Sequence, residues 1–547
     1  MHRSKMGLLG LTALAALAVF PPSAVADVVS DASACENQSD EIGIAACSRA
    51  IASRRYKGKD LAALYLNRSA EYNKKGDFDR AIADCNEAIR LDPKNAPAYN
   101  NRGNAYRAKG DRDHAIADYS EAIRLNPKYA FAYYNRGNAY ADKGDRDRAI
   151  ADYSEAIRLD PKYAFAYYNR GTAYQAKRDL DRAIADYDQA IRLDPKYAVA
   201  YYGRGNSYAD KGDRDRAIAD YSEAIRLDPK YAFAYNGRGN AYVDKGDRER
   251  AIGDYTEAIR LDPKFALAYY ARGTAYQATR DLDRAIADYD QAIRLDPKYA
   301  FAYNNRGNAH RAKGDLDRAI ADYDQAIRLD PKDVLAYNNR GNAWRDKGNR
   351  DRAIADYSEA IRLDPKYAAA YNNRCWARAT TGGDLQQALA DCTEAVRLRP
   401  DDASAIDSRG FVYLRLDRLD DAIASYDAAL KIDPRMAESM YGRGVAKLRK
   451  GDTVGGNADI AAAKAAKTTI ADEFAKWGVK LEVVAATPAA SPPATPPAAD
   501  CARAETHWKS AEEIRTVAVY EDHLARFPNC EFAGLAKARI EALKLKK

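Results

Sequence analysis

Apolar and polar positions repeat along this chain with a period of 34 residues. Proline marks the period at 93, 127, 161, 195, 229, 263, 297, 331 and 365, and again at 400 and 434 after one inserted residue near 381–383. In the copy that runs from Ala130 to Tyr163, apolar or small residues are spaced by three and four, first at Tyr133, Gly137 and Tyr140. A second run with the same spacing covers 149–159. Each run predicts one face of an amphipathic helix, so each copy predicts two short helices.

Turn residues separate these predicted helices. Gly144 and Asp145 stand between the two runs, where Gly ends one helix and Asp caps the next. Asp160 and Pro161 close the copy, because a residue that precedes proline is driven out of helical geometry. A unit of this size cannot bury its own apolar face, so neighbouring copies must stack and supply the missing core. The sequence therefore predicts an all-α solenoid.

The repeat resembles the tetratricopeptide repeat. Positions in each copy are numbered from 1 to 34, so that Ala130 is position 1 and Tyr163 is position 34 of the copy quoted above. In the preceding copy, the family's key positions 4, 8, 11, 20, 24, 27 and 32 are occupied by Tyr99, Gly103, Tyr106, Ala115, Tyr119, Ala122 and Pro127. The resemblance extends from residue 62 to about residue 470. It implies a right-handed superhelix of about twelve helix-turn-helix repeats. A stretch beginning at Gly171 recurs almost unchanged at Gly273, three repeats later, which indicates block duplication.

Position 7 departs from the family pattern. The family has an aliphatic residue there, whereas every copy here has arginine, from Arg68 to Arg443. Position 23 is aspartate in the first ten copies, as in Asp118 and Asp152. Since an unpaired arginine at a packing position would be costly, we expect partly buried Arg–Asp pairs that fix the helix register. The alternative is two solvated charges.

The ends of the chain differ from the array. We expect a signal peptide at 1–26, an N-terminal cap with a half-repeat at 27–61, and the repeat array at 62–480. Within the array, a helix near 470–477 should cover its last open face. A Pro/Ala-rich linker follows at 486–499. Residues 500–547 should form a small helical module, in which apolar residues from Trp508 to Ile540 indicate two or three helices.

The first residues have the pattern of a secretory signal. Arg3 and Lys5 precede an apolar run of about 15 residues, and Ala24-Val25-Ala26 fits a cleavage site. The mature chain should begin at Asp27, exported to the periplasm or secreted. A short membrane anchor is the alternative, although the run is shorter than the roughly 20 residues that span a bilayer. No later segment is apolar enough to span a membrane.

Charge and composition exclude several functions. The chain has 87 basic and 80 acidic residues, a net charge of +7, and the two signs interleave, which is typical of a solvated helical surface and not of a nucleic-acid-binding face. Its five histidines fall outside any paired catalytic motif, and no phosphate-binding, serine-hydrolase, zinc-protease or EF-hand motif occurs. We therefore expect no enzyme activity, cofactor or metal.

Seven cysteines lie in the expected mature chain. Export places them in an oxidising compartment, so pairing is expected. Local spacing favours three disulfides, Cys35–Cys47, Cys375–Cys392 and Cys501–Cys530, the last as a staple for the small C-terminal module. Cys85 would remain a buried thiol. The alternative is that all seven are reduced.

The resemblance also implies a binding groove lined by the first helix of each repeat, through positions 2, 5, 6, 9 and 12. Positions 5 and 9 then give the candidate ligand-binding residues Asn100, Asn104, Tyr134, Asn138, Tyr168, Tyr202, Asn206, Asn236, Asn240, Tyr270, Asn304, Asn308, Asn338 and Asn342. Position 2 is apolar throughout, including Phe131, Phe165, Phe233 and Phe301.

This groove is predicted to be neutral. Asparagine amides both donate to and accept from a peptide backbone, and tyrosine adds contact area with a polar tip. The Lys and Arg residues with which the family's chaperone adaptors hold a terminal carboxylate are absent. We expect a scaffold of the bacterial cell envelope that binds proteins or peptides, with solvent-facing Asn and Tyr side chains. Two alternatives remain: a carbohydrate-binding or polysaccharide-assembly factor, and side chains that merely solvate the inner face.

Overall fold

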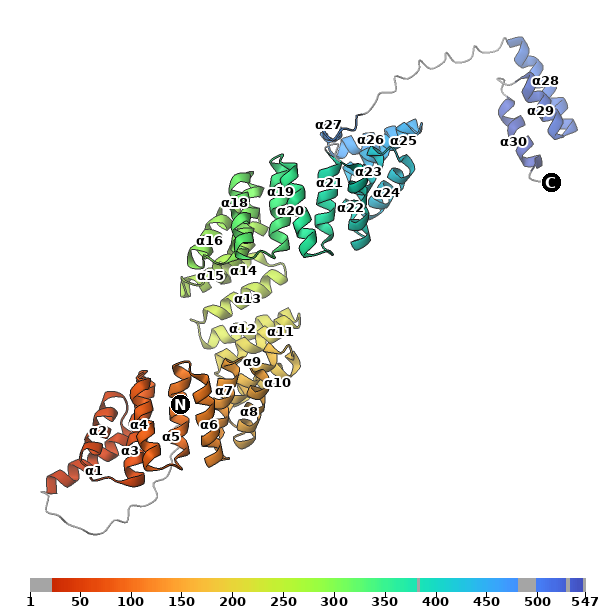
Figure 1. The fold of residues 1–547 in the computed structure, drawn as a ribbon. Helices are drawn as coiled ribbons and strands as arrows, with labels where there is room; N and C mark the ends of the chain where they lie inside the picture. Colours follow the sequence, from red (N-terminus) through yellow and green to blue (C-terminus); the bar gives the residue numbers. More distant parts are fainter. Residues whose placement is uncertain (1–21, 381–383, 481–497, 528–531, 545–547) are drawn as a thin grey trace. The chain divides into compact units, whose positions relative to one another are not determined.

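The computed structural model describes residues 22–380, 384–480, 498–527 and 532–544. All the regular secondary structure in these ranges is α-helical, so the predicted fold class is confirmed (Figure 1). The chain divides into two units, residues 1–347 and 348–547. Most of the predicted signal peptide lies outside the described residues, and its cleavage stays a prediction.

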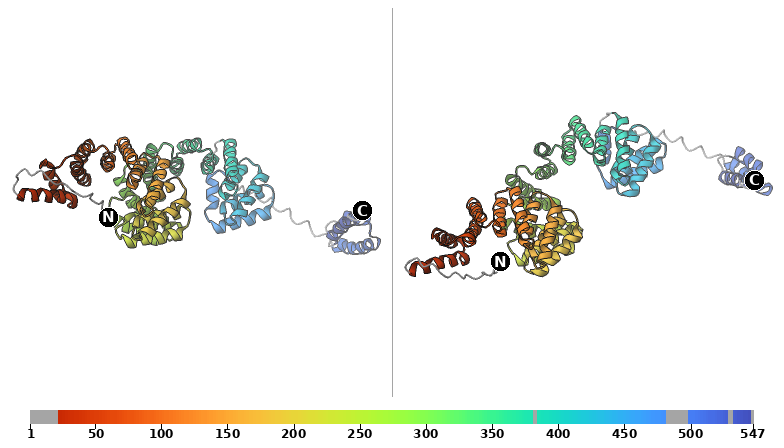
Figure 2. Two further views of the ribbon diagram at one scale, coloured as in Figure 1. Left: turned by 90° about the horizontal axis from the view of Figure 1, so that it is seen from below. Right: turned by 60° about the horizontal axis from the view of Figure 1, so that its bottom comes forward.

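Unit 1 contains helices α1 to α19, which follow one another in sequence order (Figures 1 and 2). Their bounds are α1 Pro22–Asn37, α2 Asp40–Ala52, α3 Gly58–Lys75, α4 Phe78–Leu91, α5 Ala96–Ala108, α6 Arg112–Leu125, α7 Ala130–Asp142, α8 Arg146–Leu159, α9 Ala164–Ala176, α10 Leu180–Leu193, α11 Ala198–Asp210, α12 Arg214–Leu227, α13 Ala232–Asp244, α14 Arg248–Leu261, α15 Ala266–Ala278, α16 Leu282–Leu295, α17 Ala300–Ala312, α18 Leu316–Leu329 and α19 Val334–Asp346.

Unit 2 continues the same alternation and then departs from it. Its helices are α20 Arg350–Leu363, α21 Ala368–Ala379, α22 Leu385–Leu398, α23 Ala403–Arg415, α24 Leu419–Ile432, α25 Ala437–Arg449, α26 Thr453–Ala466, α27 Ile470–Lys476, α28 Ala498–Ile514, α29 Val517–Arg526 and α30 Ala533–Lys544. The last three pack on one another through Ala511, Tyr520, Ala536 and Ile540, as expected for a small helical module.

Repeated caps set the helix boundaries. The Asp145 side chain accepts a hydrogen bond from the Arg148 backbone N–H and so caps α8. The preceding first helix, α7, ends at Asp142, and Gly144 follows with a φ of +81°, the left-handed conformation that glycine adopts without strain. Two repeats place an arginine at this position instead, Arg178 at φ +63° and Arg280 at φ +66°.

The core of most repeats consists of a tyrosine ring laid against a glycine. A Cβ atom on Gly137 would lie 2.7 Å from Cε1 of Tyr153, so only glycine admits the ring at this distance. Ala149 and Ala156 beside it are fully buried. The small residues of the repeat therefore let its two helices approach closely enough to bury tyrosine from the second helix.

The expected Arg–Asp pairs are present, and each also joins two repeats. The Arg170 guanidinium donates to both carboxylate oxygens of Asp186, at 2.8 and 2.7 Å, and its third nitrogen donates to the Ser154 hydroxyl of the preceding repeat at 2.9 Å. The Asp186 side chain is 7% exposed. Because the fork of the guanidinium fits a carboxylate in one orientation, the pair fixes the register of the two helices. The same pairing occurs in Arg68–Asp84, Arg102–Asp118, Arg136–Asp152, Arg204–Asp220, Arg238–Asp254, Arg272–Asp288, Arg306–Asp322, Arg374–Asp391 and Arg443–Asp459.

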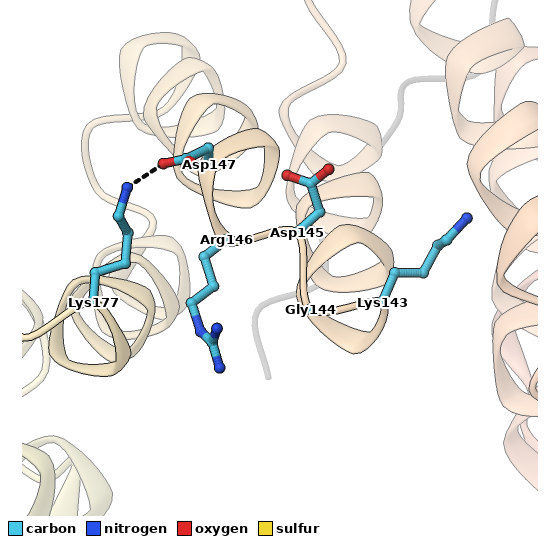
Figure 3. A pocket seen from close by; sticks show the side chains of 6 residues that line it. All are labelled: Lys143, Gly144, Asp145, Arg146, Asp147 and Lys177. Atoms are coloured by element: carbon cyan, nitrogen blue, oxygen red, sulfur yellow. Dashed lines mark hydrogen bonds and ion pairs between the residues drawn. The ribbon is translucent and has the colours of Figure 1, made fainter.

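A second, exposed set of ion pairs links neighbouring repeats at their turns. Lys177 at position 14 pairs with Asp147 at position 18 of the preceding repeat (Figure 3). Lys143 makes the equivalent contact with Asp113 at 2.6 Å. Figure 3 shows the open hollow between these turns, which is lined by their own charged side chains. Exposed pairs of this kind stabilise little, about 0–1 kcal/mol each.

Two of the three expected disulfides lie within the described residues. Cys35 is bonded to Cys47 and Cys375 to Cys392, with Cα–Cα distances of 4.6 and 5.4 Å. Cys85 is a free, buried thiol, and burial raises its pKa to about 12. The Cys501–Cys530 pairing falls outside the residues whose side chains are described and stays a prediction.

Candidate binding surface

The asparagines at position 9 are bound to the core, contrary to the expectation that they face solvent freely. The Tyr153 hydroxyl donates to Oδ1 of Asn138 at 2.8 Å, and Asn138 is 8% exposed. The same bond, from the position-24 tyrosine of the same repeat, joins Tyr119 to Asn104, Tyr221 to Asn206, Tyr255 to Asn240 and Tyr323 to Asn308. These asparagines therefore satisfy the hydroxyl of a buried tyrosine, which is a structural role.

Position 5 is likewise tied into a network between repeats. Asn169 at position 6 donates to the Tyr134 hydroxyl at 3.1 Å and to Asn138 at 2.8 Å. Equivalent bonds run from Asn135 to Asn100, from Asn305 to Tyr270 and from Asn339 to Asn304. Where the next repeat has Ala271 at position 6, the buried Oδ1 of Asn236 has no partner among the described atoms.

The candidate residues thus differ in their exposure. Asn100, Asn138, Asn236, Asn304 and Asn338 are buried, Asn104, Tyr134, Tyr168, Tyr202, Asn206, Tyr270, Asn308 and Asn342 are half-buried, and Asn240 is exposed. In the two repeats that have threonine at position 9, Thr172 and Thr274 are exposed. The accessible polar surface of the first helices is therefore narrower than the sequence indicated.

Position 2 supplies the exposed part of this surface. The position-2 stripe comprises Phe131, Phe165, Phe233, Leu267, Phe301 and Leu335, each between 45% and 59% exposed. Aromatic rings at position 34 contact three of its members, Phe131, Phe165 and Phe233. The Tyr163 ring lies 5.1 Å from Phe131 and 6.4 Å from Phe165, and 4.8 Å from Tyr134 at position 5. The sequence showed that position 2 is apolar, but it did not reveal this chain of ring contacts.

In the last three repeats of the array, the chain covers positions 5 and 9 with its own segment. α27 was expected to cover the last open face. It contacts α25 and α26 of the last repeat and also lies across the first helices: Phe474 contacts the rings of Tyr441 and Phe411 at 4.7 and 5.7 Å, and Trp477 contacts Trp376 at 4.8 Å. Phe474 is 1% exposed.

A backbone hydrogen bond fixes the end of this segment. The Arg415 guanidinium donates to the carbonyl oxygens of Trp477 and Ala379, at 2.8 and 2.7 Å. Trp376 and Phe411 stand at position 9 and Tyr441 at position 5, the positions that the family uses for ligands. Periodicity alone places Trp376 at position 9, but nothing in the sequence identifies α27 as the segment that covers it.

No metal-binding group of three or more His, Cys, Asp or Glu side chains occurs among the described residues. Nor does any described helix have the length and apolar character needed to cross a membrane.

Several sequence profiles match the repeats. A profile described as TPR repeat matches residues 70–110, 103–144, 137–177, 205–246, 239–279 and 307–344. Profiles described as tetratricopeptide repeat match 164–197, 266–299, 334–367, 288–321 and 409–469. No curated protein sequence matches the chain significantly.

Solved structures of repeat proteins are also similar. The crystal structure of MamA is 34% identical over 30% of this chain and 96% of its own, with a TM-score of 0.29. YrrB, titled a TPR protein with an unusual peptide-binding site, is 27% identical over 34% of this chain and 95% of its own, with a TM-score of 0.29. The APC/C hetero-tetramer Cut9–Hcn1 is 15% identical over 82% of this chain and 95% of that chain, with a TM-score of 0.45.

Proposed function

Because the chain belongs to the tetratricopeptide repeat family, whose members serve as protein–protein interaction scaffolds, we propose that it is a non-catalytic scaffold that holds peptide segments of partner proteins on its first helices. The location we propose is the bacterial cell envelope, on the strength of the Ala24-Val25-Ala26 cleavage pattern. Intact mass of the protein from an envelope fraction should correspond to a chain that starts at Asp27. The full-length mass, or recovery from the cytoplasm, would contradict export.

The observation that carries this proposal is the position of α27. A short segment of this protein already binds positions 5 and 9 of three successive first helices, with aromatic side chains buried and a backbone carbonyl held by Arg415. The first helices of unit 1 belong to the same repeat pattern, and within the described residues their exposed threonines and phenylalanines are not covered in this way. A segment of a partner would occupy there the place that α27 takes near the end of the array.

The test is to block this surface without unfolding the repeat. Thr172→Glu and Thr274→Glu place carboxylates on the exposed position-9 surface. Ala151→Glu and Ala287→Glu, on exposed positions of second helices, are the matched control. Partners captured from an envelope extract should be lost with the threonine variant and kept with the alanine variant.

Two further readouts identify the ligand. Binding through neutral contacts should weaken little as salt rises, because screening acts on charges. A glycan array probed with the same variants tests the alternative that the surface binds carbohydrate. Binding that persists in the threonine variant and collapses with salt would place the partner on the charged second helices and contradict the proposal.

A further inference from the structure

The position-2 stripe is the largest set of exposed apolar side chains that recurs on one face of the described residues. Its phenylalanines, from Phe131 at 48% to Phe301 at 59% exposed, lie on four repeats of unit 1. Contiguous exposed apolar surface of this kind marks an interaction site in soluble proteins. It also limits the partner, because an uncharged aromatic surface offers no counter-charge to an acidic or basic peptide.

Ring contacts join the members of the stripe in two groups. Tyr163 joins Phe131 to Phe165, and Tyr197 continues from Phe165 at 5.2 Å. The next repeat has the half-buried Val199 at position 2, and the ring contacts resume where Phe233 lies 6.3 Å from Tyr231 and 4.8 Å from Phe265. A polyproline II helix repeats every three residues, about 9 Å, and its proline rings dock between aromatic side chains. Such a ligand presents apolar rings to the stripe at regular intervals, and its stiffness leaves little entropy to lose on binding.

The surface beside the stripe also has a hydrogen-bond donor that suits this ligand. The Tyr134 hydroxyl accepts from Asn169 at 3.1 Å, so it retains its own O–H for an external acceptor. A polyproline II segment has no internal hydrogen bonds, and its carbonyl oxygens are available as acceptors. Tyr134 also contacts Tyr163, so this donor borders the stripe directly.

The chain itself contains a segment with these properties. Residues 486–499 read ATPAASPPATPPAA, with five prolines, and no charged residue occurs between Glu482 and Asp500. Pro493-Ala-Thr-Pro496 has the spacing that places two prolines on one face of a polyproline II helix. All five prolines lie outside the described residues, in the part of the chain that joins α27 to α28.

We infer that the position-2 stripe binds the proline-rich segment 486–499 of a second copy of this chain, so that the scaffold associates with itself. This inference rests on the proposed function and names one ligand for the same surface. Attachment in trans is favoured because helices α20–α27 separate the segment in sequence from the stripe. Since the stripe and the segment are different surfaces, the association is head-to-tail and can extend beyond a dimer.

The test is self-association of the full chain by sedimentation velocity. Wild-type protein should form larger species as concentration rises. A variant with Pro488, Pro492, Pro493, Pro496 and Pro497 changed to alanine should associate at least tenfold more weakly, and so should a variant that combines Phe131→Ala, Phe165→Ala and Phe233→Ala. A control that combines Ile432→Ala and Val454→Ala, exposed apolar residues that do not stand at position 2, should behave as wild type.

Mixing the two deficient variants separates the possible arrangements. The proline variant retains the stripe and the phenylalanine variant retains the segment. Docking in trans therefore predicts that the mixture forms a complex of one copy of each. Wild-type protein that stays monomeric at all concentrations, or a mixture that forms no complex, would overturn the inference. The proline variant changes no described helix, which keeps the test valid should the phenylalanine variant fold poorly. If self-association fails while the threonine variants still lose captured partners, the inference falls and the proposed function stands.

Discussion

Asp407 gives the sharpest test of the structure, because it is a carboxyl group buried where most repeats have a neutral side chain. It stands at position 5 of α23, is 8% exposed, and accepts a hydrogen bond of 2.5 Å from the Ser439 hydroxyl of α25. Burial raises its pKa to about 7 from the usual 3.8, and the charge of Glu438 acts in the same direction. The change to make is Asp407→Asn, which introduces the residue that five other repeats have at this position.

The sign of the effect follows from linkage between protonation and folding. Below about pH 4 the carboxyl is protonated in both the folded and the unfolded state. Between about pH 4 and pH 7 the unfolded state loses the proton and the folded state keeps it, so stability falls as pH rises. Above pH 7 the loss is complete, and the difference between the two pKa values corresponds to at most roughly 4 kcal/mol. The amide oxygen introduced by Asp407→Asn would still accept the bond from Ser439, and the uncharged side chain would remove this penalty.

The assay is urea unfolding of the full chain across this pH range, followed by the fluorescence of Trp376 and Trp477, with the other two tryptophans changed to phenylalanine. Because repeat arrays unfold in parts, the signal must come from this end of the array. Wild type should lose stability from pH 4 to pH 8 relative to Asp407→Asn, whereas Asp401→Asn, at an exposed carboxylate, should change nothing. An Asp407→Asn protein with the wild-type pH dependence, or with lower stability at pH 8, would refute the reasoning.

Three other predictions follow from the repeat contacts. Asn138→Ala leaves the buried Tyr153 hydroxyl without its acceptor and should cost about 1–3 kcal/mol in the free energy of unfolding, measured with urea; an unchanged value would contradict the structural role of this asparagine. Ala271→Asn should gain about 1 kcal/mol by donating to the unpartnered Oδ1 of Asn236, as other repeats do; hydrogen exchange that is no slower in α13 and α15 would argue against it. Arg280→Gly relieves a left-handed conformation and should raise the melting temperature by a stabilisation of about 1 kcal/mol, and a lower temperature would be inconsistent with the backbone geometry.

Most of the fold could be predicted from the sequence because its determinants are local and recur. The spacing of Tyr133, Gly137 and Tyr140 defines a helix face, and a proline equivalent to Pro161 stands near the end of each copy. Periodicity alone therefore places the helices. The Arg170–Asp186 pairing could also be predicted, because an arginine at a packing position requires a partner and aspartate stood at one fixed distance in nearly every copy.

The binding surface could be predicted only in part. Whether Asn138 faces a ligand or a neighbouring hydroxyl depends on where the Tyr153 hydroxyl lies, and Tyr153 is 15 residues away on another helix. Helical spacing does not contain that information. The position of α27 depends on contacts between Trp477 and Trp376, about a hundred residues apart, where the repeat pattern has already ended. Side-chain interactions between helices decided both outcomes.

The contacts between repeats have a consequence for how the gene can change. Lys177 reaches Asp147, and Arg170 reaches Ser154, through positions that carry compatible residues in most copies. Removing or adding one 34-residue copy therefore joins two surfaces that already fit, and the new junction needs no compensating substitution. Recombination between nearly identical copies, such as those that begin at Gly171 and Gly273, can change the length of the protein in whole repeats while every remaining junction keeps its chemistry.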